Sequence, residues 1–325
     1  MKRNMLSFLT VILLLVLVCL ISATTGSISV GVMELVQGLI SGTNENVAII
    51  KDLRFPRIIV ALFAGAALSV SGVLLQAVLK NPLAEAGIIG ISAGGRFVFI
   101  LMVSLFPQLF FWSPLFAFLG GGLACFLVYS LSWKTGLSPL RIILVGVAIH
   151  AAFTGLNQSF TYFIGYSSLT HATVSTLALK TWNEAELIVI YGSIGLILSL
   201  FLTLWCNVLS LQDKTAQNLG FNIVRLRVIV SIVAVLLAAA ATSVAGIIAF
   251  VGLLVPHISR LIVGTDHKVL IPFSALGGAL IILTADTLGR SIIPPTEIPA
   301  SIIMAIIGGP FLIYLLRKSD RVYGS

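Results

Sequence analysis

Charged residues are scarce in this chain of 325 residues. Asp, Glu, Lys and Arg make up 9% of it, while hydrophobic residues make up 58%. Soluble domains average about 25% charged residues, so this composition excludes a soluble protein. The formal net charge of +8 therefore does not indicate nucleic-acid binding. In a membrane protein, basic residues in the short loops set the orientation of the chain instead.

Several chemical motifs are missing as well. The chain has no GxxxxGK[ST], so it has no loop of its own for ATP phosphates, and it has neither HExxH nor CxxC. Its three cysteines, Cys19, Cys125 and Cys206, stand alone in apolar runs. Such cysteines act as small core hydrophobes, and we expect neither a metal site nor a bound cofactor.

Long apolar runs follow one another along the chain and predict about ten membrane-spanning helices. Lys2 and Arg3 precede the first run, which is longer than the apolar region of a signal peptide, so we expect it to be retained as a span. The sequence thus predicts an all-α, polytopic membrane protein with a single transmembrane domain over residues 1–325. The expected spans are 5–24, 58–79, 97–112, 115–133, 142–165, 187–206, 228–246, a short broken one near 247–262, 270–289 and 299–316.

The basic residues support this number of spans. With both termini in the cytoplasm, 14 of the 19 Lys and Arg residues fall on the inner side, as the positive-inside rule requires. The outer side keeps five, which are Lys51, Arg54, Arg57, Lys180 and Arg290. The chain is therefore predicted to lie in a cytoplasmic membrane with both ends inside.

Glycine, serine and proline residues predict close helix packing in the second span and a break in the eighth. Gly65, Ser69 and Gly72 recur at helical spacing in the second span, a pattern that lets membrane helices approach closely. Gly252 and Pro256 interrupt the eighth span. Non-helical backbone at membrane depth requires cover by protein or by a water-filled cavity.

Ionisable residues inside the expected spans are few. His150 lies near the middle of the fifth span, where it is expected to pack rather than to act as a ligand or proton carrier. Asp286 lies near the outer end of the ninth, where we expect it to cap the helix or to pair with Arg290 one turn later. Residues 90–94 match the G-x-S-x-G nucleophile elbow, so an intramembrane serine hydrolase using Ser92 and His150 is one alternative. An ion-coupled secondary transporter is another, although such a protein should carry more intramembrane charge.

The longest inner loop covers about 207–227. Asp213 can cap a short helix there and Gly220 can end it. A short polar helix on the cytoplasmic face favours docking of a soluble partner, and an ordinary interfacial loop is the alternative interpretation.

Several blocks of sequence together resemble one family, the ten-span permeases of binding-protein-dependent, ATP-driven importers for iron-siderophores, haem and vitamin B12. The resemblance runs almost end to end, and its fold is expected to be that of the vitamin B12 importer permease. Two stretches, 179–182 and 293–299, look most like the haem permeases of Gram-positive bacteria, and the tryptophan–glycine–serine element of many siderophore permeases is absent. The resemblance therefore implies an iron complex as the cargo, with haem favoured and a ferric siderophore as the alternative. The matching blocks are 54–94, 215–220, 246–260, 264–267, 285–290, 297–299 and 308–310.

The resemblance implies roles and partners. It implies a transport subunit without enzymatic activity, two separate ATPase subunits that use ATP–Mg, an extracellular lipid-anchored binding protein, and a second permease copy or a related subunit. Family positions place binding-protein docking at Arg54, Arg57 and Arg290, and anchoring at the membrane interface is the alternative for them. The fifth span is expected to line the translocation path, which makes His150 a path residue, and Ser138 and Pro139 before it are expected to form the cytoplasmic gate. The ATPase coupling residues are placed at Asp213, Thr215, Ala216, Leu219 and Gly220.

Overall fold

In the computed structural model the described residues are 2–25, 30–42, 44–132, 139–164, 177–293 and 296–323. Within these ranges the protein is helical, apart from turns and one isolated bridge between Ile293 and Thr296. The all-α prediction is confirmed.

Seven helical stretches are long and apolar enough to cross a membrane, and three shorter apolar helices accompany them. The long ones contain α1 (Lys2–Thr24), α4 (Phe55–Leu79), α6 (Ser113–Ser132), α7 (Pro139–Ile164), α9 (Trp182–Phe201), α12 (Ile223–Ala245) and α14 (His267–Ile292). The shorter apolar stretches are α5 (Ile91–Leu105), α13 (Val251–Val263) and the part of α15 (Ala300–Tyr323) that ends at Leu315. Together they match the ten expected spans. The remaining elements are α2 (Val32–Ser41), α3 (Glu45–Leu53), the 3-10 helix η1 (Pro107–Trp112), α10 (Thr203–Leu209) and α11 (Asp213–Asn218).

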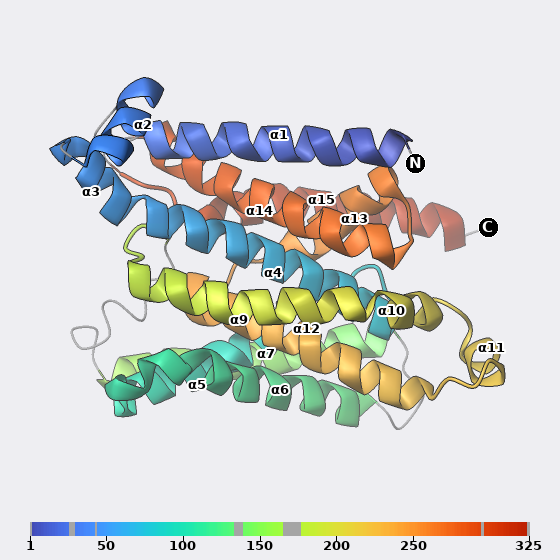
Figure 1. The fold of residues 1–325 in the computed structure, drawn as a ribbon. Coiled ribbons are helices and arrows are strands. Elements are labelled where there is room, and N and C mark those ends of the chain that lie inside the picture. Colours follow the sequence, from blue (N-terminus) through green and yellow to red (C-terminus); the bar gives the residue numbers. More distant parts are fainter. Residues whose placement is uncertain are drawn as a thin grey trace.

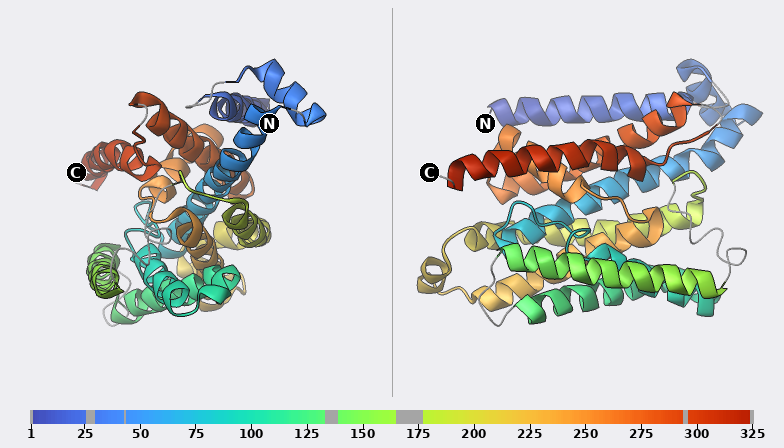
Figure 2. Two further views of the ribbon diagram at one scale, coloured as in Figure 1. Left: turned by 90° about the vertical axis from the view of Figure 1, so that its left-hand side faces the viewer. Right: turned by 180° about the vertical axis from the view of Figure 1, so that it is seen from behind.

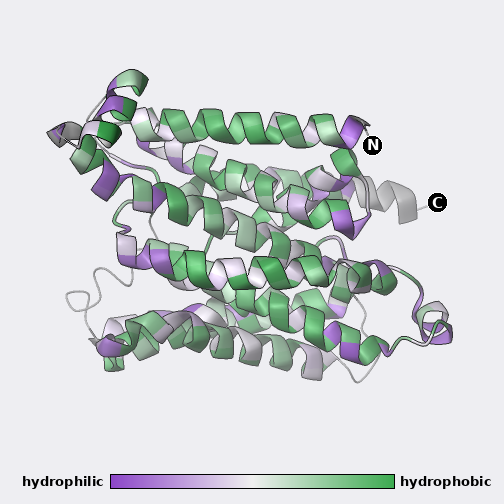
Figure 3. Cartoon of the chain, in the orientation of Figure 1, coloured by the Kyte–Doolittle hydropathy of each residue, from purple (hydrophilic) through white to green (hydrophobic). Residues whose placement is uncertain are grey.

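The long helices run side by side, and both chain ends lie at the same end of the bundle (Figure 1). The short helix α11 lies at that end too, whereas α2 and α3 lie at the opposite end. Hydrophobic residues fill the middle of the helices, and hydrophilic ones gather towards the two ends (Figure 3). This distribution is that of a multi-pass membrane protein, and with the positive-inside bias it makes the end with the termini the inner end.

Helix α4 runs through the centre of the bundle, and almost all of it is buried. Its small residues allow the close packing that their spacing predicted. A Cβ atom on Gly65 would lie 2.1 Å from the carbonyl oxygen of Gly278 in α14, and one on Gly72 would lie 2.0 Å from that of Gly252 in α13. Between them, Ser69 donates a hydrogen bond of 2.6 Å to a backbone carbonyl of α14.

The broken eighth span is confirmed. Residues between α12 and α13 are not helical, and Phe250 has a positive φ of 68°. Side chains from the α4 side satisfy this backbone. The N–H of Phe250 donates to the buried carboxylate of Glu85 at 3.1 Å, and Gln76 donates to the carbonyl of Gly252 at 3.0 Å. Arg260 in turn donates to the Gln76 side-chain oxygen at 2.5 Å.

Two boundaries differ from the sequence prediction. The outer loop near 25–53 contains the helices α2 and α3, because Leu35, Val47 and Ile50 find buried positions there. The third span is α5, which begins at Ile91 rather than at 97. Arg96 therefore belongs to a membrane-spanning helix and not to an inner loop.

Candidate functional site

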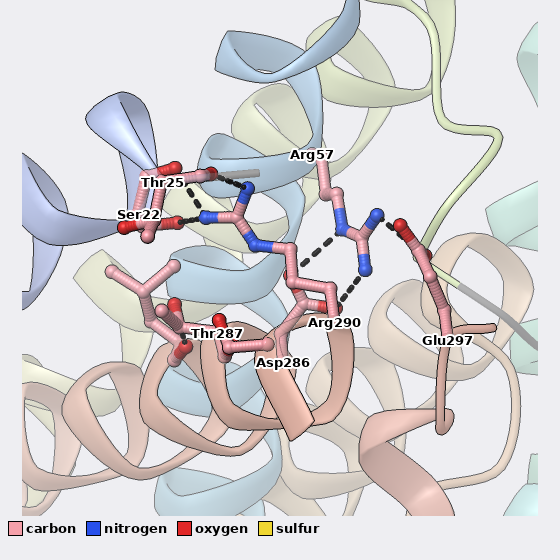
Figure 4. Close-up of polar contacts among 9 residues, drawn as sticks. Ser22, Thr25, Arg57, Asp286, Thr287, Arg290 and Glu297 are labelled. Carbon is pink, nitrogen blue, oxygen red and sulfur yellow. Dashed lines mark hydrogen bonds and ion pairs between the residues drawn. The ribbon is translucent and has the colours of Figure 1, made fainter. Parts of the chain in front are cut away.

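A buried ion-pair network occupies the outer end of the bundle (Figure 4). Arg57, in the first turn of α4, donates from Nε and Nη2 to the two carboxylate oxygens of Asp286, both at 2.8 Å. Its Nη1 donates to Glu297 at 2.9 Å. The side chains of Arg57 and Asp286 are 10% and 3% exposed, whereas that of Glu297 is 40% exposed. Glu297 is thus the accessible member of the network.

The other two outer arginines hold the C-terminal end of α1. Arg290 donates from Nη1 to the carbonyl of Thr25 at 2.8 Å, and from Nη2 to both the carbonyl and the hydroxyl of Ser22. Arg54 donates to the carbonyl of Ala23 at 2.8 Å. Carbonyls at a helix C-terminus lack intrahelical partners and carry partial negative charge. The guanidinium groups therefore act as a cap for α1.

The structure brings the three predicted docking residues together at the outer end, but it also buries each of them. Their head groups bond within the chain, which sequence reasoning did not anticipate. The prediction that Asp286 pairs with Arg290 was wrong, because Arg57 from the distant α4 takes both oxygens of Asp286. Docking at Arg54, Arg57 and Arg290 stays a prediction.

At the inner end, Asp213 anchors the short helix α11. Lys80 donates to Asp213 at 2.7 Å, and Arg227 donates to both of its oxygens at 3.0 and 2.9 Å. The Lys80 hydrogen bond is the main reason why the pKa of Asp213 lies below its usual range. The cap prediction for Asp213 was wrong, because Gln212 occupies the N-cap position without a side-chain bond. Gly220 does end the turn, with a φ of +86°.

The other predicted coupling residues divide between two faces of α11. Ala216 is fully buried, and its carbonyl accepts the N–H of Phe221 at 3.2 Å. Thr215 is exposed, and Leu219 is 62% exposed. Thr215 and Leu219 are therefore the members of this set that a partner could reach, and Ala216 is not. The coupling role of these residues remains a prediction.

Of the three predicted gate and path residues, the structure describes Pro139 and His150. Ser138 lies outside the described residues, and Pro139 is the first residue of α7. His150 is half-buried in α7, where the backbone lies against the turn before α5, since a Cβ on Gly90 would lie 3.0 Å from the His150 nitrogen. Its Nδ1 is buried without a hydrogen-bond partner in the described part of the chain. The packing role and the path role both stay open for His150.

Comparison with known proteins identifies the family. The sequence pattern of the FecCD transport family matches residues 13–318, which is nearly the whole chain. The chain belongs to the FecCD transport family.

This FecCD permease is 42% identical over 320 residues to the "Probable heme-iron transport system permease protein IsdF" of Staphylococcus aureus strain bovine RF122 / ET3-1, with 98% of each chain covered. It is similar to a solved structure described as "an inward-facing conformation" of a "metal-chelate type ABC transporter", with 30% identity, a TM-score of 0.76, and coverage of 97% of this chain and 99% of that one. Its fold also resembles PsaBC of Streptococcus pneumoniae, with 16% identity, a TM-score of 0.62, and coverage of 87% and 95%.

Family membership overturns the hydrolase hypothesis, because a FecCD protein is a permease subunit of an ABC transporter and not an enzyme. The geometry agrees. Ser92 is a buried residue in the first turn of α5, and the residues before it form turns rather than a strand. No hydrogen bond joins the side chains of Ser92 and His150, both of which are described.

Sequence reasoning missed one residue of this FecCD permease, Arg96. Drawing the third span from 97 excluded the charge from the membrane, although the apolar run begins before it. A second signal was available, since Thr154, Asn157, Gln158 and Thr161 recur on one face of the fifth span at helical spacing. A polar stripe on a membrane helix calls for a polar neighbour. Among the described residues, no group of three or more His, Cys, Asp or Glu side chains could hold a metal ion.

Proposed function

We propose that this permease is the membrane-spanning subunit of an ATP-driven importer that carries haem iron into a Gram-positive bacterium. The observation that carries the proposal is the 42% identity over 98% of the chain to a permease named for heme-iron transport. The sequence lacks an ATP-binding loop, so separate ATPase subunits supply the energy. Membership of an ABC permease family favours ATP over an ion gradient as the driving force.

Two ATPase subunits that use ATP–Mg dock at the inner end, one on each of two permease copies. The support is α11, a short helix that projects at that end (Figure 1) and presents the exposed Leu219. Asp213 ties α11 to α4 through Lys80 and to α12 through Arg227. A push on α11 by an ATPase would therefore reach the two most buried helices of the bundle.

A second copy, or a related subunit, completes the path. Helices α7 and α15 lie on the same side of the bundle in the end-on view (Figure 2). Both carry large exposed apolar side chains, such as Val147 and Phe163 in α7 and Ile306 in α15. Between two such faces, the cargo would pass along α7.

A lipid-anchored binding protein docks at the outer end through carboxylates. Arg57 already holds Asp286 through a buried, bidentate pair and Glu297 through one accessible bond. An incoming carboxylate would displace Glu297 rather than Asp286, because Glu297 is the exposed partner. Glu297→Gln should then strengthen docking, since a neutral amide competes less well for a guanidinium. Unchanged or weaker docking by this variant, with Glu186→Gln as the exposed control, would contradict this mode.

Uptake in vesicles tests the function. Permease, ATPase and binding protein are reconstituted together, and haem accumulation is followed with ATP, without ATP, and with vanadate. We expect ATP-dependent, vanadate-sensitive uptake of haem that an excess of a ferric hydroxamate siderophore does not suppress. Uptake of the siderophore but not of haem would refute the cargo, and uptake driven by an ion gradient alone would refute the importer.

A further inference from the structure

Arg96 places a positive charge within the membrane-spanning helix α5. It is the sixth residue of a helix of 15 residues, and its side chain is half-buried. Charged residues in membrane spans are costly, so those that persist face a protein interior or a cavity and mark binding sites or transport paths. Arg96 is therefore a candidate for contact with the cargo.

A cavity of about 450 Å³ lies where Arg96 faces α7. This volume falls within the roughly 300–1,000 Å³ of ligand pockets. No carboxylate stands among the described residues that line it, so the lining has a positive charge. Its polar side chains are Arg96, Thr154, Asn157, Gln158, Thr161 and Tyr162.

Hydrogen bonds hold two of the polar side chains of α7, Asn157 and Thr161, in fixed orientations. Asn157 is 8% exposed, and its amide nitrogen donates to the carbonyl of Ala93 in α5 at 3.2 Å. This bond fixes the orientation of the amide, so that its Oδ1 remains buried without a hydrogen-bond partner. Thr161 donates to the backbone carbonyl of Asn157 at 2.8 Å. The unsatisfied Oδ1 points to a ligand that donates a hydrogen bond, because buried polar groups are ordinarily paired. The charge of Arg96 favours a ligand that also carries a carboxylate.

We propose that this cavity binds a carboxylate of the cargo in transit, with Arg96 as the anchor. The inference rests on the proposed function, because haem carries two propionate carboxylates on one edge of its ring. The planar guanidinium can hold a carboxylate through two parallel hydrogen bonds. Asn157 Oδ1 would accept a hydrogen bond from the second propionate in its protonated form, and the exposed Tyr162 also lines the cavity. The cavity takes the propionate arm, while the apolar ring stays in the path.

The test compares Arg96→Gln with the wild type in the reconstituted importer, using haem and haem dimethyl ester, in which both propionates are neutral. We expect Arg96→Gln to slow haem uptake about tenfold, which corresponds to about 1.4 kcal/mol, and to leave ester uptake at the wild-type rate. Arg96→Lys should recover part of the haem rate, because it restores the charge without the fork. Lys51→Gln, which removes an exposed outer charge, should transport both compounds normally.

Two results would overturn the proposal: equal rates of haem uptake by Arg96→Gln and wild type, or equal slowing of haem and ester. Equilibrium dialysis of the purified complexes gives a readout that does not depend on turnover. Wild-type protein should bind haem more tightly than the ester, and Arg96→Gln should lose that difference. Absence of ATP-dependent haem uptake by the wild type would instead refute the proposed function, and dialysis would still decide whether Arg96 recognises the carboxylate.

Discussion

Replacing Arg57 by alanine should strongly destabilise the folded permease. The substitution leaves the carboxylate of Asp286, 3% exposed, without the guanidinium that binds both of its oxygens. Removing one partner of a buried pair costs about 3–5 kcal/mol, because the remaining charge stays desolvated and unpaired. Whole domains have only about 5–15 kcal/mol of stability. Arg57→Ala should therefore remove a large share of it.

The same network provides an internal comparison. Glu297 bonds to the same guanidinium, but its side chain is 40% exposed, so Glu297→Gln should cost roughly 0–1 kcal/mol. The double variant Arg57→Met with Asp286→Leu removes both buried charges together. Its stability should return to within about 1–2 kcal/mol of the wild type, because apolar side chains of similar volume often replace a buried pair without loss.

Equilibrium unfolding of the purified permease in mixed micelles of mild detergent and dodecyl sulfate, followed by circular dichroism, measures these differences. Equal losses of stability in Arg57→Ala and Glu297→Gln, or a double variant as unstable as Arg57→Ala, would contradict this prediction. The result also bears on docking, since loss of uptake in Arg57→Ala would report misfolding rather than a missing contact.

Three further outcomes are expected. Gly65→Ala should destabilise by about 1–3 kcal/mol in the same unfolding assay, because its Cβ would lie 2.1 Å from a carbonyl oxygen of α14, whereas Gly122→Ala meets open space and should not destabilise; equal effects would contradict the close-packing argument. Gly220→Val should leave insertion intact but uncouple ATP hydrolysis from uptake, because a β-branched residue is strained at a φ of +86°; normal uptake at matched expression would count against this. The lowered pKa of Asp213 means that its anchoring of α11 is complete above the ordinary carboxyl pKa of about 3.9 and is lost as the pH falls through the lower folded value. The protection factors of the α11 amides, which compare exchange with its intrinsic rate at the same pH, should thus fall on acidification below pH 4, and Asp213→Asn should abolish that pH dependence.

The sequence could predict the spans because the apolar runs and the spacing of small residues are local signals. Gly65 and Gly72 pack as their spacing indicated. The broken eighth span could also be predicted from its glycine and proline, although its partners could not. Glu85 and Gln76 lie far from Phe250 in the chain, and nothing in a local pattern joins them.

The pairing and burial of charged side chains could not be predicted either, because their partners lie far apart in the chain. Asp286 lies one turn from Arg290, so a local rule pairs them, but the folded chain brings Arg57 from 229 residues away. Arg96 was misplaced because a hydropathy window penalises a charge at the edge of a span, whereas the cavity beside α7 accommodates it. The outer arginines could be assigned to the correct end of the molecule, but their burial emerges only from the packing of α1 and α4 against α14.

The cap on α1 has a consequence for biosynthesis. Helix α1 leaves the ribosome before the other described helices, and most of its side chains face outward from the bundle. Its bond to Arg290 joins residues 268 positions apart in the chain. At a synthesis rate of about 5–20 residues per second, α1 waits roughly 13–54 s in the bilayer before that arginine is made. Because Arg54 emerges much earlier and reaches the carbonyl of Ala23, it can hold α1 provisionally, and Arg290 then completes the attachment near the end of translation.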